Sequence, residues 1–120
     1  MSGWEDTWKL IVIQLGGNDI CVASCGEGGA DYAGDATASG WKTNMKTALT
    51  TLKSALPKTL VVFTAIYDPT KLADVTNPPF SCKFIFPTLC PCLSDSNRPS
   101  MVELRVQYEE NLVELAAEMR

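Results

Sequence analysis

The segment best placed to do chemistry is Gly-Gly-Asn-Asp at residues 16–19, which directly follows a nearly continuous apolar run at residues 10–15. This run is rich in β-branched residues and predicts a strand buried on both faces, as in parallel sheets. Two glycines after a strand let the backbone turn sharply and approach another molecule closely. Open α/β sheets bind ligands beyond the carboxyl ends of their strands. The side-chain amide of Asn18 would lie there, where it can donate a hydrogen bond to a developing oxyanion.

A plainer interpretation of the same residues is also open. Gly16 and Gly17 with Asn18 can form a tight turn after the strand, because Asn tolerates a left-handed backbone conformation. Asp19 is better explained as a cap or turn acceptor than as a catalytic acid. The pattern alone does not separate a turn from a site.

The chain contains no histidine, the usual general base near neutral pH. A Ser-His-Asp mechanism therefore cannot be built from these residues alone. Ser24, Ser39 and Ser81 are candidate nucleophiles by residue type, but none lies in a Gly-x-Ser-x-Gly motif and none has a histidine to activate it. We therefore predict that the chain carries one part of an active site and lacks the rest.

Size and charge exclude several classes of protein. The 120 residues suffice for one modest domain. The net charge of −4, with scattered basic residues, argues against nucleic acid as a partner. The longest apolar runs fall far short of the roughly 20 residues of a transmembrane helix, so no transmembrane segment is expected. The polar, acidic start does not read as a secretory signal peptide.

Cysteine is abundant for this length. The five residues are Cys21, Cys25, Cys82, Cys90 and Cys92. Their clustering in two segments favours disulfides and an oxidising compartment, and the odd count leaves at least one without a partner in this chain. Buried free thiols and a zinc site are the alternatives, although the C-x₃-C and C-x-C spacings fit zinc poorly.

The remaining sequence indicates how such a site is positioned. An apolar stripe through Trp41, Met45 and Leu49 predicts a helix over residues 39–56, with Ser39 as its N-cap. Residues 59–66 predict a second buried strand, which completes a β-α-β unit with parallel strands. Ser100 and Glu103 match a capping box and predict the start of a last helix. Its apolar stripe comprises Met101, Leu104, Tyr108, Leu112, Leu115 and Met119.

Two segments are expected to lack regular structure. Residues 21–40 are rich in Gly, Ala and Asp and read as a long surface loop. Residues 67–99 contain many prolines and read as irregular chain held by cross-links through the later cysteines. Two strands and two helices cannot cover a parallel sheet on both faces. We therefore expect an α/β fold in which residues 1–120 form one partial domain.

Residues 8–21, which end in Asn-Asp-Ile-Cys, resemble the third conserved block of SGNH/GDSL hydrolases, and more closely that of their membrane-associated phospholipase B branch. Three further features agree with this branch: Leu-Pro-Lys-Thr-Leu-Val-Val at residues 56–62, Cys-Pro-Cys at residues 90–92, and Tyr-Glu-Glu-Asn-Leu at residues 108–112. The similarity covers residues 8–118. It implies a three-layer α/β/α (flavodoxin-like) fold that lacks its N- and C-terminal parts here.

The resemblance also implies roles for individual residues. Asn18 would donate its amide to the oxyanion hole, and Gly16 would shape the same loop. The nucleophile of the family lies in a Gly-Asp-Ser motif and its base in an Asp-x-x-His motif, and neither motif is present in this chain. The implied reaction is cofactor-free and metal-free hydrolysis of acyl esters of phospholipids or lysophospholipids, for which this chain alone would be inactive.

The resemblance implies an extracellular or membrane-associated location through the secretory pathway. One alternative is a non-catalytic SGNH-like protein that binds lipid or another protein. A second is a Cys-rich metal module.

Overall fold

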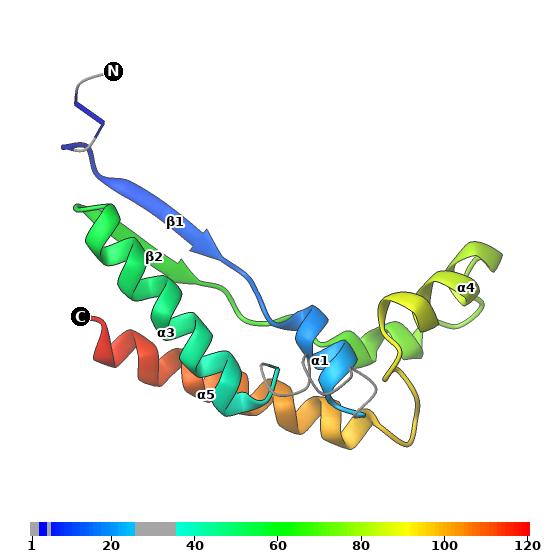
Figure 1. Cartoon of the computed structure of the whole chain (residues 1–120). Helices are drawn as coiled ribbons and strands as arrows, with labels where there is room; N and C mark the ends of the chain where they lie inside the picture. Colours follow the sequence, from blue (N-terminus) through cyan, green and yellow to red (C-terminus); the bar gives the residue numbers. More distant parts are fainter. Residues whose placement is uncertain (1–2, 5, 26–35) are drawn as a thin grey trace.

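The computed structural model describes residues 3–4, 6–25 and 36–120. Within these ranges the fold mixes helices with a small sheet of two parallel strands (Figure 1). The elements in chain order are β1 (Lys9–Ile13), α1 (Gly17–Ala23), α3 (Ala38–Ala55), β2 (Thr59–Phe63), the 3₁₀ helix η1 (Pro69–Asp74), α4 (Phe80–Leu89) and α5 (Arg98–Glu118). The expected parallel pairing is confirmed, with Lys9 opposite Thr59 and Ile13 opposite Phe63. Both strands end earlier than predicted.

The described residues cover one face of the sheet and leave the other open. Ile13, Val61 and Phe63 pack against the core beneath α3 and α5. On the other face Leu10 and Val12 of β1 are 65% and 58% exposed, and no described residue covers them. The prediction of a strand buried on both faces is therefore wrong for the chain as it stands. Side chains alternate across a strand, and a second layer would be needed to bury the outer set.

Helix α3 follows the predicted apolar stripe. Trp41, Met45 and Leu49 are buried, as expected from their spacing. The helix begins at Ala38, one residue earlier than predicted, and its N-cap is Thr37, two residues before the predicted Ser39. Thr37 has an extended backbone, and its hydroxyl accepts a hydrogen bond from the backbone N–H of Gly40 at 3.1 Å.

Helix α5 also buries its predicted stripe, but its start was misplaced. Four residues of the stripe are buried, namely Met101, Tyr108, Leu112 and Leu115. The helix begins at Arg98, with Asn97 at the N-cap and Pro99 in the first turn, so Ser100 and Glu103 do not form the predicted capping box. Proline is favoured in a first turn because its missing N–H would have no partner there.

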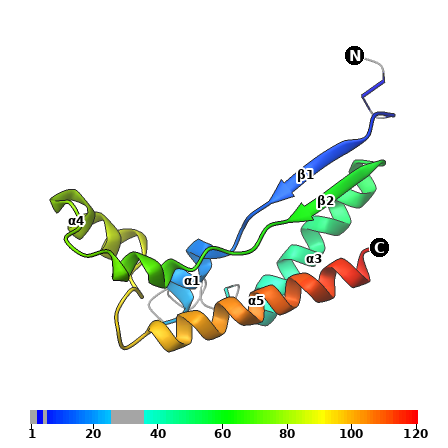
Figure 2. The same ribbon diagram turned by 180° about the vertical axis from the view of Figure 1, so that it is seen from behind.

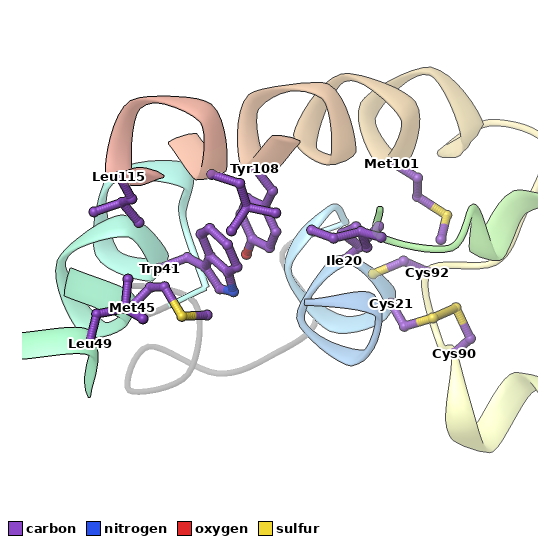
Figure 3. Packing of buried hydrophobic residues seen from close by; sticks show 12 residues of the cluster. Ile20, Cys21, Trp41, Met45, Leu49, Cys90, Cys92, Met101, Tyr108 and Leu115 are labelled. Carbon is purple, nitrogen blue, oxygen red and sulfur yellow. A yellow bond between two sulfur atoms is a disulfide. The ribbon is translucent and has the colours of Figure 1, made fainter. Parts of the chain in front are cut away.

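Helices α3 and α5 pack together through an aromatic pair (Figure 3). Trp41 stacks on Tyr108 with ring centroids 4.5 Å apart and planes 12° apart. The hydroxyl of Tyr108 donates to the buried carbonyl of Ala36, and the amide of Asn111 donates to the carbonyl of Ala38 at 2.8 Å. These bonds fix the start of α3 against the middle of α5.

Residues 67–99 are more regular than predicted, since they contain η1 and α4. Two disulfides hold this segment to α1 and to the residues that directly follow it: Cys21–Cys90 and Cys25–Cys92. Cys82 is the free cysteine. The prediction of disulfides with an unpaired residue is confirmed, and the four bonded sulfurs are not available as zinc ligands.

The predicted loop at residues 21–40 is partly helical, since α1 extends to Ala23 and α3 begins at Ala38. Residues 26–35 of that loop lie outside the described residues. Figure 2 shows α4 projecting from the end of the molecule that holds α1, away from the sheet. Over the described ranges, no helix combines the length and the apolar character needed to cross a bilayer.

Candidate functional site

The Gly-Gly-Asn-Asp segment forms the turn between β1 and α1. Gly16 has a φ of 114°, a left-handed conformation that side chains rarely adopt, and it is the N-cap of α1. A Cβ at this position would lie 3.0 Å from the side chains of both Ile66 and Tyr108, which are buried. Glycine is therefore required here by backbone conformation and by packing together.

Asn18 lies in the first turn of α1 with its side chain exposed. It lines a pocket of about 260 Å³. The pocket residues are Gln14, Leu15, Gly16, Gly17, Asn18, Asp19, Ile66 and Tyr67. Within the described part of the chain, the carboxamide of Asn18 has no hydrogen-bond partner, so both its N–H groups are available to a ligand.

This geometry tests the interpretation of residues 16–18 as a simple tight turn. Gly16 does make a tight turn, but Asn18 has a helical backbone and is not the left-handed residue. Asp19 lies in the first turn of α1 without a side-chain capping bond. A carboxylate there interacts favourably with the helix dipole. The left-handed residue of the turn is therefore Gly16, and Asn18 lines the pocket.

The pocket lies beyond the carboxyl ends of both strands, where α/β sheets bind their ligands. One wall follows β1, and the other consists of Ile66 and Tyr67, which follow β2. Gln14 joins the two walls by donating its amide to the carbonyl of Ala65 at 3.2 Å.

The sequence reasoning did not single out Tyr67, whose ring packs against Gly17. A Cβ at Gly17 would lie 2.1 Å from the ring carbon Cε1 of Tyr67. The absence of a side chain at Gly17 thus gives the ring its place beside the pocket. The position of Tyr67 shortly after the predicted second strand was a usable signal, because parallel strands end at the same edge of a sheet.

The candidate serines do not converge on this pocket. Ser24 follows α1 and donates its hydroxyl to the carbonyl of Ile20 at 2.7 Å. Ser39 lies in the first turn of α3 and Ser81 in α4. None of the three is a lining residue of the pocket that holds Asn18. The described residues therefore place an amide donor at the pocket, and no serine or cysteine is among the residues that line it.

The ionisable groups with displaced pKa values lie away from the pocket. The guanidinium of Arg98, 2.6 Å from Asp74, lowers the pKa of that carboxyl. Lys46, 2.6 Å from Glu118, lowers the pKa of Glu118 on the far end of α5. These are surface ion pairs between helices and stabilise the fold only modestly. Over residues 3–4, 6–25 and 36–120, no group of three or more His, Cys, Asp or Glu side chains could hold a metal ion.

Comparison with known proteins gives one informative relative. The chain is 30% identical over 114 residues to "Phospholipase B1, membrane-associated" of Rattus norvegicus. The match covers 89% of this chain and 7% of the rat protein, so the chain spans a small part of that relative. No family profile matches the sequence. No solved structure matches it either. The similarity supports a relation of this chain to phospholipase B1.

Proposed function

We propose that this relative of phospholipase B1 supplies the oxyanion-hole residue of a phospholipase B-like serine esterase. The carboxamide of Asn18 donates to the substrate oxygen, and residues outside this sequence provide the nucleophilic Ser and the Asp/His pair. The proposal assigns the chain a phospholipid or lysophospholipid substrate. It makes the chain inactive alone, because no histidine is present to activate a serine.

One observation carries the proposal: the amide of Asn18 is exposed, lacks a partner among the described residues, and lines a pocket beyond two parallel strands. Attack of a serine on an ester carbonyl forms a tetrahedral intermediate with a negatively charged oxygen. An amide donor held in place by α1 stabilises that charge without reorganising. Gly16 fixes the turn that begins α1, so it acts on the site by positioning Asn18.

The uncovered sheet face supports the further proposal that residues 1–120 are one part of a three-layer SGNH domain. Helices α3 and α5 form one layer and β1 with β2 form the second. The outer side chains of the sheet would be covered by a third layer from elsewhere in the domain. These exposed side chains are Leu10, Val12, Leu60 and Val62. A parallel sheet normally has both faces covered.

The proposed location is extracellular or membrane-associated. The two disulfides support it, because such bonds persist mainly in oxidising compartments. The name of the rat relative is consistent with this location.

A second candidate function is a non-catalytic protein that binds lipid or protein through the same scaffold. The observation in its favour is the exposure of Phe80 and Phe84 on α4. The two candidates differ in whether Asn18 matters, since a purely binding role does not require an oxyanion donor.

The first test uses the chain alone. We expect the purified protein to release no fatty acid from lysophosphatidylcholine or from a short-chain nitrophenyl ester above the rate of buffer. Turnover that persists after treatment with serine-directed inhibitors and after the Asn18→Ala substitution would contradict the assignment.

The second test uses the transcript that encodes this chain. We expect it to encode a Gly-Asp-Ser motif before these residues and an Asp-x-x-His motif after them. In that longer protein, Asn18→Ala should lower kcat about 10²–10³-fold, as loss of one oxyanion donor does, with little change in KM. Asn44→Ala, at an exposed position of α3, is the matched control and should leave kcat unchanged. An unchanged kcat for Asn18→Ala would favour the binding role.

A further inference from the structure

Helix α4 is the most exposed apolar element among the described residues. None of its ten residues is buried. Its exposed apolar side chains are Phe80 (77%), Phe84 (63%), Ile85 (48%) and Leu89 (65%). A group of large apolar side chains exposed together on one element indicates a contact surface.

The distribution of these side chains identifies the kind of surface that they fit. At about 100° per residue, Phe80 and Phe84 form one row and Ile85 and Leu89 form a second row, with the exposed Ser81 and Thr88 between them on the same half of the helix. Cys82 and Phe86 are half-buried and lie on the opposite half of the helix. A helix bound in a protein groove buries a single stripe. Two rows of apolar side chains over roughly half the circumference of the helix fit a wide apolar surface, such as the acyl-chain layer of a lipid membrane, better than a narrow groove.

The charged residues of α4 also favour contact with a lipid surface. The helix contains no acidic residue, although the whole chain has a net charge of −4. Lys83 is its only charged side chain and lies outside the two apolar rows. Helices that lie in the plane of a lipid surface combine apolar side chains such as Phe and Leu with Lys or Arg, whose charges meet phosphate groups, and α4 offers one such Lys. At ten residues α4 is too short to span a bilayer.

The position of α4 joins this surface to the candidate site. Cys90 follows α4 directly and is bonded to Cys21 in α1, the helix that carries Asn18. The backbone N–H of Cys92 also donates to the carbonyl of Cys21 at 3.0 Å. Figures 1 and 2 both show α4 projecting beyond α1, clear of the sheet. A flat surface can therefore reach α4 without first meeting the α/β body.

From these observations we infer that α4 is an interfacial anchor, which inserts Phe80, Phe84, Ile85 and Leu89 into the outer layer of a phospholipid membrane or micelle. The inference rests on the proposed function for the lipid nature of the substrate. The two disulfides then hold the Asn18 pocket close to the surface from which substrate is drawn.

The test is binding of the full chain to sucrose-loaded vesicles of phosphatidylcholine, measured by sedimentation. We expect the wild-type chain to bind, and Phe80→Ser with Phe84→Ser to lower the partition coefficient by about tenfold or more. The matched control is Leu10→Ser with Val12→Ser on the open sheet face, which is comparably exposed and should leave vesicle binding unchanged. One free thiol per denatured, unreduced chain confirms that each variant keeps both disulfides.

A Phe84→Trp variant gives a direct signal from the helix. Its added fluorescence should shift to the blue on vesicle binding and be quenched by lipids brominated in the acyl chain. No binding by the wild-type chain, equal loss in both double variants, or an unquenched Trp at position 84 would overturn the inference. So would a phenylalanine-dependent dimer in sedimentation velocity, which would assign α4 to a second copy. Failure of the Asn18 experiment alone would leave this binding result unaffected.

Discussion

The two disulfides should stabilise the chain in a strongly non-additive way. Cys21–Cys90 and Cys25–Cys92 join positions 69 and 67 residues apart. Either bridge alone therefore closes a long loop in the unfolded chain. Once one bridge exists, the other closes a ring of only about six residues, because 25 − 21 = 4 and 92 − 90 = 2.

The loop-entropy relation converts these lengths into free energies of unfolding. The long loop contributes about 4.4 kcal/mol near room temperature and the small ring about 2.2 kcal/mol. Removing one bridge opens only the small ring, so it should cost about 2 kcal/mol whichever bridge is chosen. Removing both should cost about 6.6 kcal/mol, well above the sum of the two single effects.

The measurement is urea denaturation followed by tryptophan fluorescence, which reports on the buried Trp41. The variants replace one or both cysteine pairs by alanine in a Cys82→Ala background, which prevents disulfide exchange. Cys82→Ala is itself the control. Because Cys82 is unbonded and only half-buried, its substitution should change stability by less than about 1 kcal/mol. If the cost of removing both pairs equals the sum of the single costs, the nested-loop reasoning is refuted.

Two further predictions concern single positions. Gly16→Ala should destabilise the fold by about 2–4 kcal/mol, because it combines a left-handed backbone with a Cβ crowded against buried side chains. Gly17→Ala should lower the free energy of unfolding by less, since the half-exposed ring of Tyr67 can turn aside. Equal losses of stability for the two variants in thermal unfolding would contradict this reasoning. The pKa of Asp74 is held below its ordinary value by Arg98, so this pair stabilises the fold at neutral pH and the effect is lost as pH falls through that lowered pKa. Arg98→Gln should therefore lower the melting temperature at pH 7 and converge with the wild type in acid, whereas a pH-independent difference would exclude this cause.

The elements that the sequence predicted well are those with a local repeating pattern. The stripe through Trp41, Met45 and Leu49 located α3, and the apolar runs located β1 and β2. The ends were less predictable. Thr37 and Ser39 are both good N-caps by residue type, and only the extended backbone of Thr37 decides between them.

Helix α4 was missed because its sequence lacks the usual signals. Apolar residues are spread around it, so no single stripe marks a buried face. Pro87 within it reads as a helix breaker, whereas Pro79 in fact stands at its N-cap. Burial of β1 on both faces was mispredicted for a related reason. The apolar sequence of a strand shows which of its side chains can be buried. Whether both faces are covered depends on other residues that pack against the sheet.

The place of the candidate pocket was predictable from the sequence, but not the full set of residues that line it. The position of Asn18 after a strand placed it correctly at the carboxyl edge of the sheet. The contribution of Tyr67 depends on its contact with Gly17, which sequence spacing does not reveal. The pairing of Cys21 with Cys90 likewise depends on the three-dimensional course of residues 67–99.

The two-stranded sheet has a consequence for amide hydrogen exchange. The backbone N–H of Lys9 donates to Lys58, and that of Thr64 donates to Ile13. Since alternate residues of a parallel strand bond to the same neighbour, the N–H groups of Leu10 and Val12 point to the other edge of β1, where no described strand pairs with it. In this chain these two amides should exchange with deuterated water far faster than those of their neighbours along β1. Protection of the same two amides in a longer protein would show that another strand has joined the sheet at that edge.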